Sequence, residues 1–250
     1  MRLLALDIGN TAVTYGFFEK SRLKRHGSVL HSDIPKIVKR WSSSGLINDN
    51  YVLISSVVPS LTHKIKKLFS PSGAKIGVIG GNLRVPIRHR YRNLKTLGSD
   101  RILNIYGALQ MYKAPLLILD FGTAITADYI SGKGVFEGGM IIPGPEIAFQ
   151  TLIHRAALLP KKARLPEKSV SFLGRTSYDC MKSGILEGYG AMTDGLVERF
   201  KARFGKNLKV LATGGFARCL KPYTHSFDIF DPLHSLKSLH LIYKELVISD

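Results

Sequence analysis

The sequence is poor in acidic residues for its length. Aspartate and glutamate together number 18, against 36 lysines and arginines, so the formal net charge is +18. Such a charge attracts phosphates, anionic substrates or nucleic acid. The basic residues are nevertheless spread over many short stretches, without the interleaved aromatic residues of a single-strand groove and without a zinc-finger or recognition-helix pattern. These absences argue against specific nucleic-acid binding.

Cysteines and long apolar runs are also scarce. The two cysteines, Cys180 and Cys219, lack the spacing of metal ligands, and we expect packed free thiols in a reducing compartment. No apolar run is long enough to cross a bilayer. The N-terminus passes directly from Met1 and Arg2 into a predicted strand, without the features of a signal peptide. We therefore expect no membrane association and a cytoplasmic location.

The length and composition favour two globular lobes. The chain has 250 residues, of which 45% are hydrophobic and 22% charged, and this length exceeds that of a typical single domain. We predict an N-terminal lobe over residues 1–113 and a C-terminal lobe over residues 114–250.

One motif occurs twice, once in each predicted lobe. Residues 3–14 and residues 116–126 both consist of a short apolar run, an aspartate, a glycine-containing turn that ends in threonine, and a second β-rich run. Each copy predicts a β-hairpin. The glycine lets the main chain approach an anion, and the aspartate at the strand end can hold a hydrated divalent cation. Two such hairpins would form a phosphate clamp, although a single copy alone would be read as an ordinary tight turn.

The remaining pattern alternates strands and helices. Helices are predicted at 35–41, 59–68, 98–111, 145–157, 177–203 and 235–244; further strands at 51–58, 115–120, 123–130, 134–142 and 210–212; an exposed connector at 78–92; a binding loop formed by Gly138-Gly139 and Pro143-Gly144; and a charged loop at 160–166.

Several further motifs carry a resemblance to a known family. They are Ser55 to Pro59, Tyr91 with Asn93, Gly98 with Asp100-Arg101, Leu158 to Pro160, and Thr213-Gly214-Gly215. In this order, together with the two hairpins, they resemble the type III pantothenate kinases. This family belongs to the acetate and sugar kinase, Hsp70 and actin superfamily. The resemblance implies an α/β fold of two related ribonuclease H-like lobes, and ATP-dependent phosphorylation of pantothenate to 4'-phosphopantothenate, the first step of coenzyme A biosynthesis.

The resemblance also implies roles for individual residues. Asp100 is the candidate base that accepts the proton of the substrate hydroxyl, although on the residues alone it reads as a helix N-cap. Asp7 would position Mg²⁺ through water, and Asp120 would serve a monovalent cation, K⁺ or NH₄⁺; the sequence does not separate these two assignments. The proposed phosphate and nucleotide contacts are Gly9, Asn10, Thr11, Gly122, Thr123, Gly214 and Gly215.

The implied pantothenate pocket lies at a homodimer interface. Its candidate residues are Tyr91, Gly98, Ser99, Asp100, Arg101 and Ser177. Arg101 would pair with the substrate carboxylate or organise the dimer, and the plainer alternative is a surface arginine. For Tyr91 and Ser177 the alternatives are a packed tyrosine and a helix-capping serine.

The sequence departs from the family pattern at several positions. Ala12 stands where an asparagine is usual, Leu94 replaces a proline, Ala156 replaces a threonine and Ser238 replaces a glycine. None of these changes removes a proposed acid, base or metal ligand, so we still expect activity. Two other functions stay open: a transcription-associated protein like the Bvg accessory factor, and a kinase for another small hydroxy acid.

Overall fold

The computed structural model describes residues 2–43, 50–156, 158–159, 165 and 170–248. The chain divides into two compact units: unit 1 comprises Met1–Tyr112 and Leu233–Asp250, and unit 2 comprises Lys113–Pro232. The sequence-based division at 113/114 placed the C-terminal segment with the second lobe. In the structure this segment forms helix α7 (His234–Leu246), which packs on helix α3 (Ser99–Met111) and on strand β1 (Arg2–Ile8) of unit 1.

Unit 1 contains a five-stranded mixed sheet within its described residues. The strand order is β3-β2-β1-β4-β5, in which β1, β2 and β3 are antiparallel and β1, β4 and β5 are parallel. The elements that complete the sheet and cover it are β2 (Ala12–Glu19), β3 (Arg22–Leu30), α1 (Ile34–Ser43), β4 (Tyr51–Ser56), α2 (Pro59–Phe69) and β5 (Lys75–Val78).

Unit 2 repeats this topology. Its described sheet has the order β10-β9-β6-β7-β8, with β6, β7 and β8 antiparallel and β6, β9 and β10 parallel. The elements are β6 (Leu116–Phe121), β7 (Ala124–Ile130), β8 (Phe136–Pro143), α4 (Pro145–Arg155), α5 (Ser177–Phe204), β9 (Lys209–Thr213), α6 (Ala217–Leu220) and β10 (Ile229–Phe230). The duplicated motif therefore reflects a duplicated fold, as predicted.

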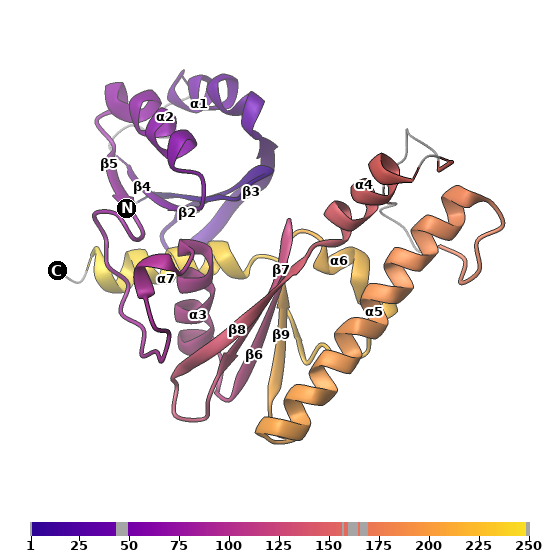
Figure 1. Ribbon diagram of the computed structural model, residues 1–250. Helices are drawn as coiled ribbons and strands as arrows, with labels where there is room; N and C mark the ends of the chain where they lie inside the picture. The colour runs from indigo at the N-terminus through magenta and orange to yellow at the C-terminus, as the bar shows by residue number, and fades with distance from the viewer. Residues whose placement is uncertain (1, 44–49, 157, 160–164, 166–169, 249–250) are drawn as a thin grey trace. The chain divides into compact units, whose positions relative to one another are not determined.

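Helices cover both faces of the unit 1 sheet (Figure 1). On one face, Leu6 and Ile8 of β1 join the apolar side chains of α1 and α2, with Trp41 as the largest member. Because side chains alternate along a strand, Asp7 faces the other side of the sheet, where Ser235 of α7 hydrogen-bonds to it. The alternation of side chains therefore places the Asp7 carboxylate on the face of the sheet that α3 and α7 cover.

The contact between α3 and α7 depends on a glycine. A Cβ atom at Gly107 would lie 1.7 Å from the Oγ atom of Ser238. Ser238 is fully buried, and its hydroxyl donates to the carbonyl oxygen of His234 at 2.8 Å. Ser238 is accommodated because Gly107, its neighbour on α3, has no side chain.

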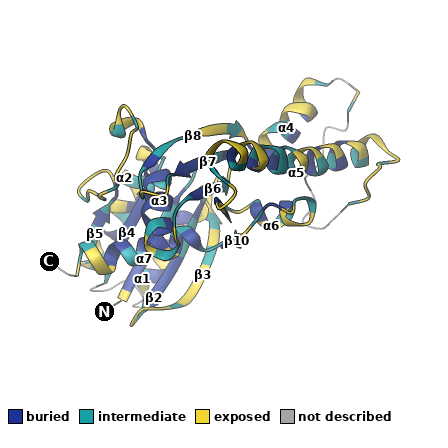
Figure 2. Cartoon of the chain, turned by 90° about the horizontal axis from the view of Figure 1, so that it is seen from below, coloured by how far each residue is buried: buried dark blue, intermediate teal, exposed yellow. Residues whose placement is uncertain are grey.

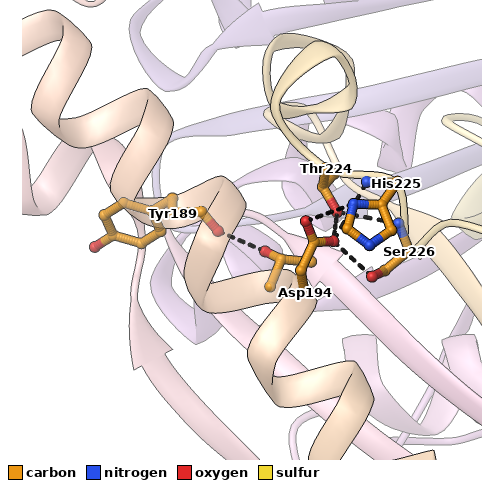
Figure 3. A network of polar contacts seen from close by, with 6 residues as sticks. Tyr189, Asp194, Thr224, His225 and Ser226 are labelled. Atoms are coloured by element: carbon orange, nitrogen blue, oxygen red, sulfur yellow. Dashed lines mark hydrogen bonds and ion pairs between the residues drawn. The ribbon is translucent and has the colours of Figure 1, made fainter. Parts of the chain in front are cut away.

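In unit 2, helix α5 alternates buried and exposed positions along its length (Figure 2). Polar contacts of Asp194 connect the central part of α5 to the segment after α6 (Figure 3). Asp194 Oδ1 accepts hydrogen bonds from the hydroxyls of Thr224 and Ser226, both at 2.5 Å, and its Oδ2 lies 3.0 Å from Nδ1 of His225. Close approach is possible here because Gly190 has no Cβ, which would lie 2.0 Å from the carbonyl oxygen of Tyr223.

The structure differs from the sequence-based predictions in several details. The short edge strands β5 and β10 were not predicted, and β8 continues through Gly138 and Gly139, so only the main chain around Gly144 forms a loop. Both cysteines are free as predicted, but Cys180 is exposed instead of packed. The predicted loop at 160–166, and with it Pro160, falls almost wholly outside the described residues. No helix of the described chain is both long and apolar enough to span a membrane.

Candidate functional site

Two carboxylates from distant parts of the sequence lie close together in unit 1. Asp7 is near the end of β1, beside Ser55 of the parallel strand β4, and Asp100 is in the first turn of α3. Burial raises the pKa of Asp7 to about 6, and repulsion from the Asp100 carboxylate adds to this rise, whereas hydrogen bonds from Ser235 and Ser55 oppose it. Burial also raises the pKa of Asp100, and contacts with Arg101 oppose the rise.

Hydrogen bonds of Ser99 link the start of α3 to the end of β4. Its hydroxyl donates to the carbonyl oxygen of Ser56 at 2.8 Å and accepts from the Ser56 amide at 2.9 Å. It also lies 3.3 Å from the Ser55 hydroxyl, which bonds to Asp7. The buried serine therefore holds the two carboxylate-bearing elements in register. Ser55 and Ser235 were absent from the predicted site, although Ser55 lies in a motif that the sequence singled out.

The Gly98-Ser99-Asp100-Arg101 turn has a distinct role for each residue. The N-cap position of α3 belongs to Gly98 and not to Asp100, so the capping alternative for Asp100 does not hold. Asp100 Oδ1 accepts a hydrogen bond from the Arg101 amide at 2.8 Å. A Cβ atom at Gly98 would lie only 2.3 Å from the same carboxylate oxygen. The glycine thus leaves the space that the Asp100 carboxylate occupies.

Arg101 and Tyr91 form a pair beside this turn. The Arg101 side chain is buried, with 6% of its surface exposed, which excludes the surface alternative. Its guanidinium lies 5.7 Å from the centroid of the half-buried Tyr91 ring. A guanidinium held over an aromatic face is oriented for a planar anion such as a carboxylate.

The tip of the first hairpin is open to solvent. Asn10 and Thr11 are exposed, and the Gly9 amide closes the turn by donating to the carbonyl oxygen of Ala12 at 3.1 Å. His31 Nε2 lies 2.9 Å from the Gly9 carbonyl oxygen, which fastens the turn to the following segment. The exposed hairpin tip is therefore accessible to a ligand, and the carbonyl group of Ala12 takes part in closing the turn.

The second hairpin is closed in the same way and is packed more tightly. The Gly122 amide donates to the carbonyl oxygen of Ala124 at 3.1 Å, and the Gly144 amide donates to that of Thr123 at 3.1 Å. Gly214 has a φ of +93°, and a Cβ atom there would lie 2.4 Å from Oδ1 of Asp120. The exposed Gly215 follows. The predicted nucleotide residues of unit 2 are thus neighbours in space.

Ser177 lies elsewhere in unit 2, at the first turn of α5. Thr176, and not Ser177, caps this helix, since its Oγ1 accepts from the Asp179 amide at 3.2 Å. The exposed Ser177 lines a hollow of about 530 Å³ together with Arg175, Thr176 and Met181. Its hydroxyl is therefore available to a ligand.

The carboxylates of Asp7 and Asp100 are suited to bind a cation that a bound ligand also coordinates. Two desolvated carboxylates that repel each other gain when positive charge enters between or beside them. Among the described residues, no three histidine, cysteine, aspartate or glutamate side chains form a metal-binding group. Water and phosphate oxygens would have to supply the other ligands, as is usual for Mg²⁺.

Known proteins resemble this chain in sequence and in fold. A sequence profile of the type III pantothenate kinase family matches residues 3–199. The fold resembles that of a conserved Baf family transcriptional activator from Campylobacter jejuni, with a TM-score of 0.60 at 19% identity over 97% of this chain and 98% of that one. It also resembles a 2-dehydro-3-deoxygalactonokinase protein from Sinorhizobium meliloti, with a TM-score of 0.61 at 10% identity over 98% and 99% of the chains.

A third similar structure is MreB5 of Spiroplasma citri bound to AMPPNP, with a TM-score of 0.56 at 12% identity over 99% of this chain and 97% of that one. At such low identity these structures concern the fold alone, and they support the predicted α/β fold of two related lobes. The profile covers most of the chain and includes both hairpins, the Gly98 to Arg101 turn and Ser177. This chain therefore belongs to the type III pantothenate kinase family.

Proposed function

We propose that the chain transfers the terminal phosphate of ATP to the terminal hydroxyl of pantothenate, giving 4'-phosphopantothenate. The observation that carries the proposal is the pair of desolvated carboxylates of Asp7 and Asp100, which lie close together where Ser99 links α3 to β4. The chain that holds this pair is a member of this kinase family. The product would enter coenzyme A biosynthesis.

Asp100 acts as the general base in this proposal. A substrate alcohol is a weak acid, so a carboxylate with a raised pKa assists the step by taking the proton as the bond to phosphorus forms. Gly98 leaves room for this carboxylate, and the neighbouring Arg101 amide orients it. Arg101 and Tyr91 would receive the carboxylate and amide groups of pantothenate, and the hydroxyl of Ser177 would complete the pocket.

The two hairpins bind ATP in this proposal. Gly9, Asn10, Thr11, Gly122 and Thr123 would contact the phosphates, and Gly214 and Gly215 would contact the adenosine. Asp7 would hold Mg²⁺ through water, and Asp120 would hold K⁺ or NH₄⁺. Bound Mg²⁺ would neutralise charge on the transferred phosphate.

We also propose a homodimer that completes the substrate site. Large apolar side chains on β8 and α4 support it, because exposed apolar patches mark protein–protein interfaces. Met140, Ile141, Ile147 and Leu152 are each at least 40% exposed. Sedimentation of the purified protein tests this state. The cytoplasmic location stays a prediction from the sequence.

The test is ATP turnover by purified protein with pantothenate, in potassium and in sodium buffer. We expect product with pantothenate, more of it in potassium, and its loss in Asp100→Asn. Asp33→Asn is the matched control, because it makes the same change at an exposed position of unit 1. Turnover with other small hydroxy acids, but not with pantothenate, would mean that the protein is a kinase with a different substrate.

A transcription-associated function is the second candidate. It is supported by the formal net charge of +18 and by the similarity of fold to the Baf family protein of Campylobacter jejuni. It predicts sequence-specific DNA binding that weakens steeply with salt. A kinase with a basic surface should instead show weak retention that does not depend on the DNA sequence.

A further inference from the structure

A cavity of about 620 Å³ lies in unit 1 between β2, β3 and α1. It is on the α1 face of the sheet, because Phe17 and Trp41 belong to the core on that face, whereas Asp7 faces the opposite side. The cavity therefore has no part in the site proposed above. Its volume lies in the range of sites for small organic ligands.

The floor of the cavity is aromatic. The rings of Tyr15 and Trp41 are 4.9 Å apart, and those of Phe17 and Trp41 are 5.2 Å apart, both in edge-to-face contact. Phe17 and Trp41 are buried, and Tyr15 is half-buried. Tyr15 leans over Gly27 of β3, where a Cβ atom would lie 2.8 Å from the tyrosine hydroxyl. A flat ring of a ligand could stack on such a floor.

The rim of the cavity is basic. Arg25 lies directly opposite Phe17 in the sheet register, and Lys24 and Arg40 also line the cavity. All three side chains are exposed, and within the described part of the chain none makes a hydrogen bond or an ion pair. Among the residues that the structure describes, none of those lining the cavity is acidic. Guanidinium groups without partners are suited to bind phosphate oxygens in a bidentate manner.

We propose that this cavity binds a small aromatic phosphate of the nucleoside monophosphate type, at a site separate from the kinase centre. The ring stacks on the floor formed by Tyr15, Phe17 and Trp41, and the phosphate pairs with Arg25 and Arg40. A small ligand fits better than a nucleic-acid strand, because the aromatic side chains form one enclosed cluster instead of a row along a groove.

The chain supplies its own probe, because Trp41 is its single tryptophan. The experiment titrates AMP into the full-length protein and follows Trp41 fluorescence, excited at the red edge where adenine does not absorb. We expect a saturable change with AMP. Adenosine should bind at least about tenfold more weakly, the equivalent of one charge-assisted hydrogen bond, and inorganic phosphate should leave the emission unchanged.

Two variants on α1 separate the site from the general charge of the protein. Arg40→Gln should weaken AMP binding about tenfold. Lys39→Gln removes the same charge one residue away, from an exposed side chain that does not line the cavity, and should change the affinity less than about twofold. Circular dichroism shows that both variants are folded. Equal effects of the two changes, or no saturable signal, would overturn the proposal.

Two further measurements identify the ligand and the site. The Trp41 response should persist in Asp7→Asn, since Asp7 lies on the other face of the sheet; its loss there would assign the signal to the kinase centre and refute the second site. A short oligodeoxythymidylate that binds about a hundredfold more tightly than AMP, with a steep salt dependence, would make a nucleic-acid strand the occupant and would equally overturn the proposal.

Discussion

Replacing Asp7 by asparagine should stabilise unit 1 at neutral pH. Burial and the Asp100 charge raise the pKa of Asp7 from 3.8 to about 6 in the folded chain. The folded state therefore binds more protons than the unfolded state between these two values, so the free energy of unfolding falls as the pH rises through this window. The full difference corresponds to an upper limit of about 3 kcal/mol. Asparagine avoids this cost because it carries no charge and can still bond to the serine hydroxyls.

The assay is urea unfolding of the wild type and of Asp7→Asn, from about pH 4 to pH 8. Trp41 is the single tryptophan and belongs to the core of unit 1, so its fluorescence follows this unit. We expect the two proteins to be about equally stable at the acidic end. At the alkaline end the variant should be more stable by about 2 to 3 kcal/mol.

Asp33→Asn, at an exposed position of the same unit, is the control for a general effect of charge. The reasoning would be refuted by a stability difference between the wild type and Asp7→Asn that does not change with pH, or by a variant that is less stable at pH 8. The variant should also lose turnover. Stability and activity would then be opposed at this position, as is common where a site holds a buried charge.

Three further predictions concern residues that the structure places in tight contact. Gly98→Ala sets a Cβ atom 2.3 Å from Oδ1 of Asp100, and the displaced carboxylate should lower ATP turnover with pantothenate by about 10²-fold. Asp194→Ala removes the acceptor of several hydrogen bonds (Figure 3) and should cost unit 2 about 2 to 4 kcal/mol in urea unfolding followed by circular dichroism. Gly190→Ala should cost about 2 kcal/mol or more in the same assay, because its Cβ would meet main chain at 2.0 Å. Gly195→Ala, in the same helix with open space around it, should instead stabilise by about 0.5 to 1 kcal/mol; equal effects of the two glycine changes would contradict the packing argument.

The features that could be predicted from the sequence are local. The two hairpins, each with an aspartate, a glycine and a threonine in this order, and the start of α3 at Ser99 follow from short-range periodicity and turn chemistry, which act over a few residues. The strands β5 and β10 could not be predicted in this way, because they have four and two residues and exist only through pairing with a central strand. A segment of two to four residues is too short to show the alternation of apolar and polar residues from which a strand is predicted.

The sequence alone determined the duplicated hairpins and the α/β fold class, and its motifs indicated the family. Only the tertiary structure decided that Asp7 and Asp100 share one desolvated place, that Ser99 and Ser55 join their elements, and that α7 belongs to unit 1. It also placed exposed basic side chains around the aromatic floor of a cavity in unit 1. The physical reason is that desolvation, charge repulsion and packing arise between residues that are distant along the chain, and local sequence patterns contain no information on such encounters.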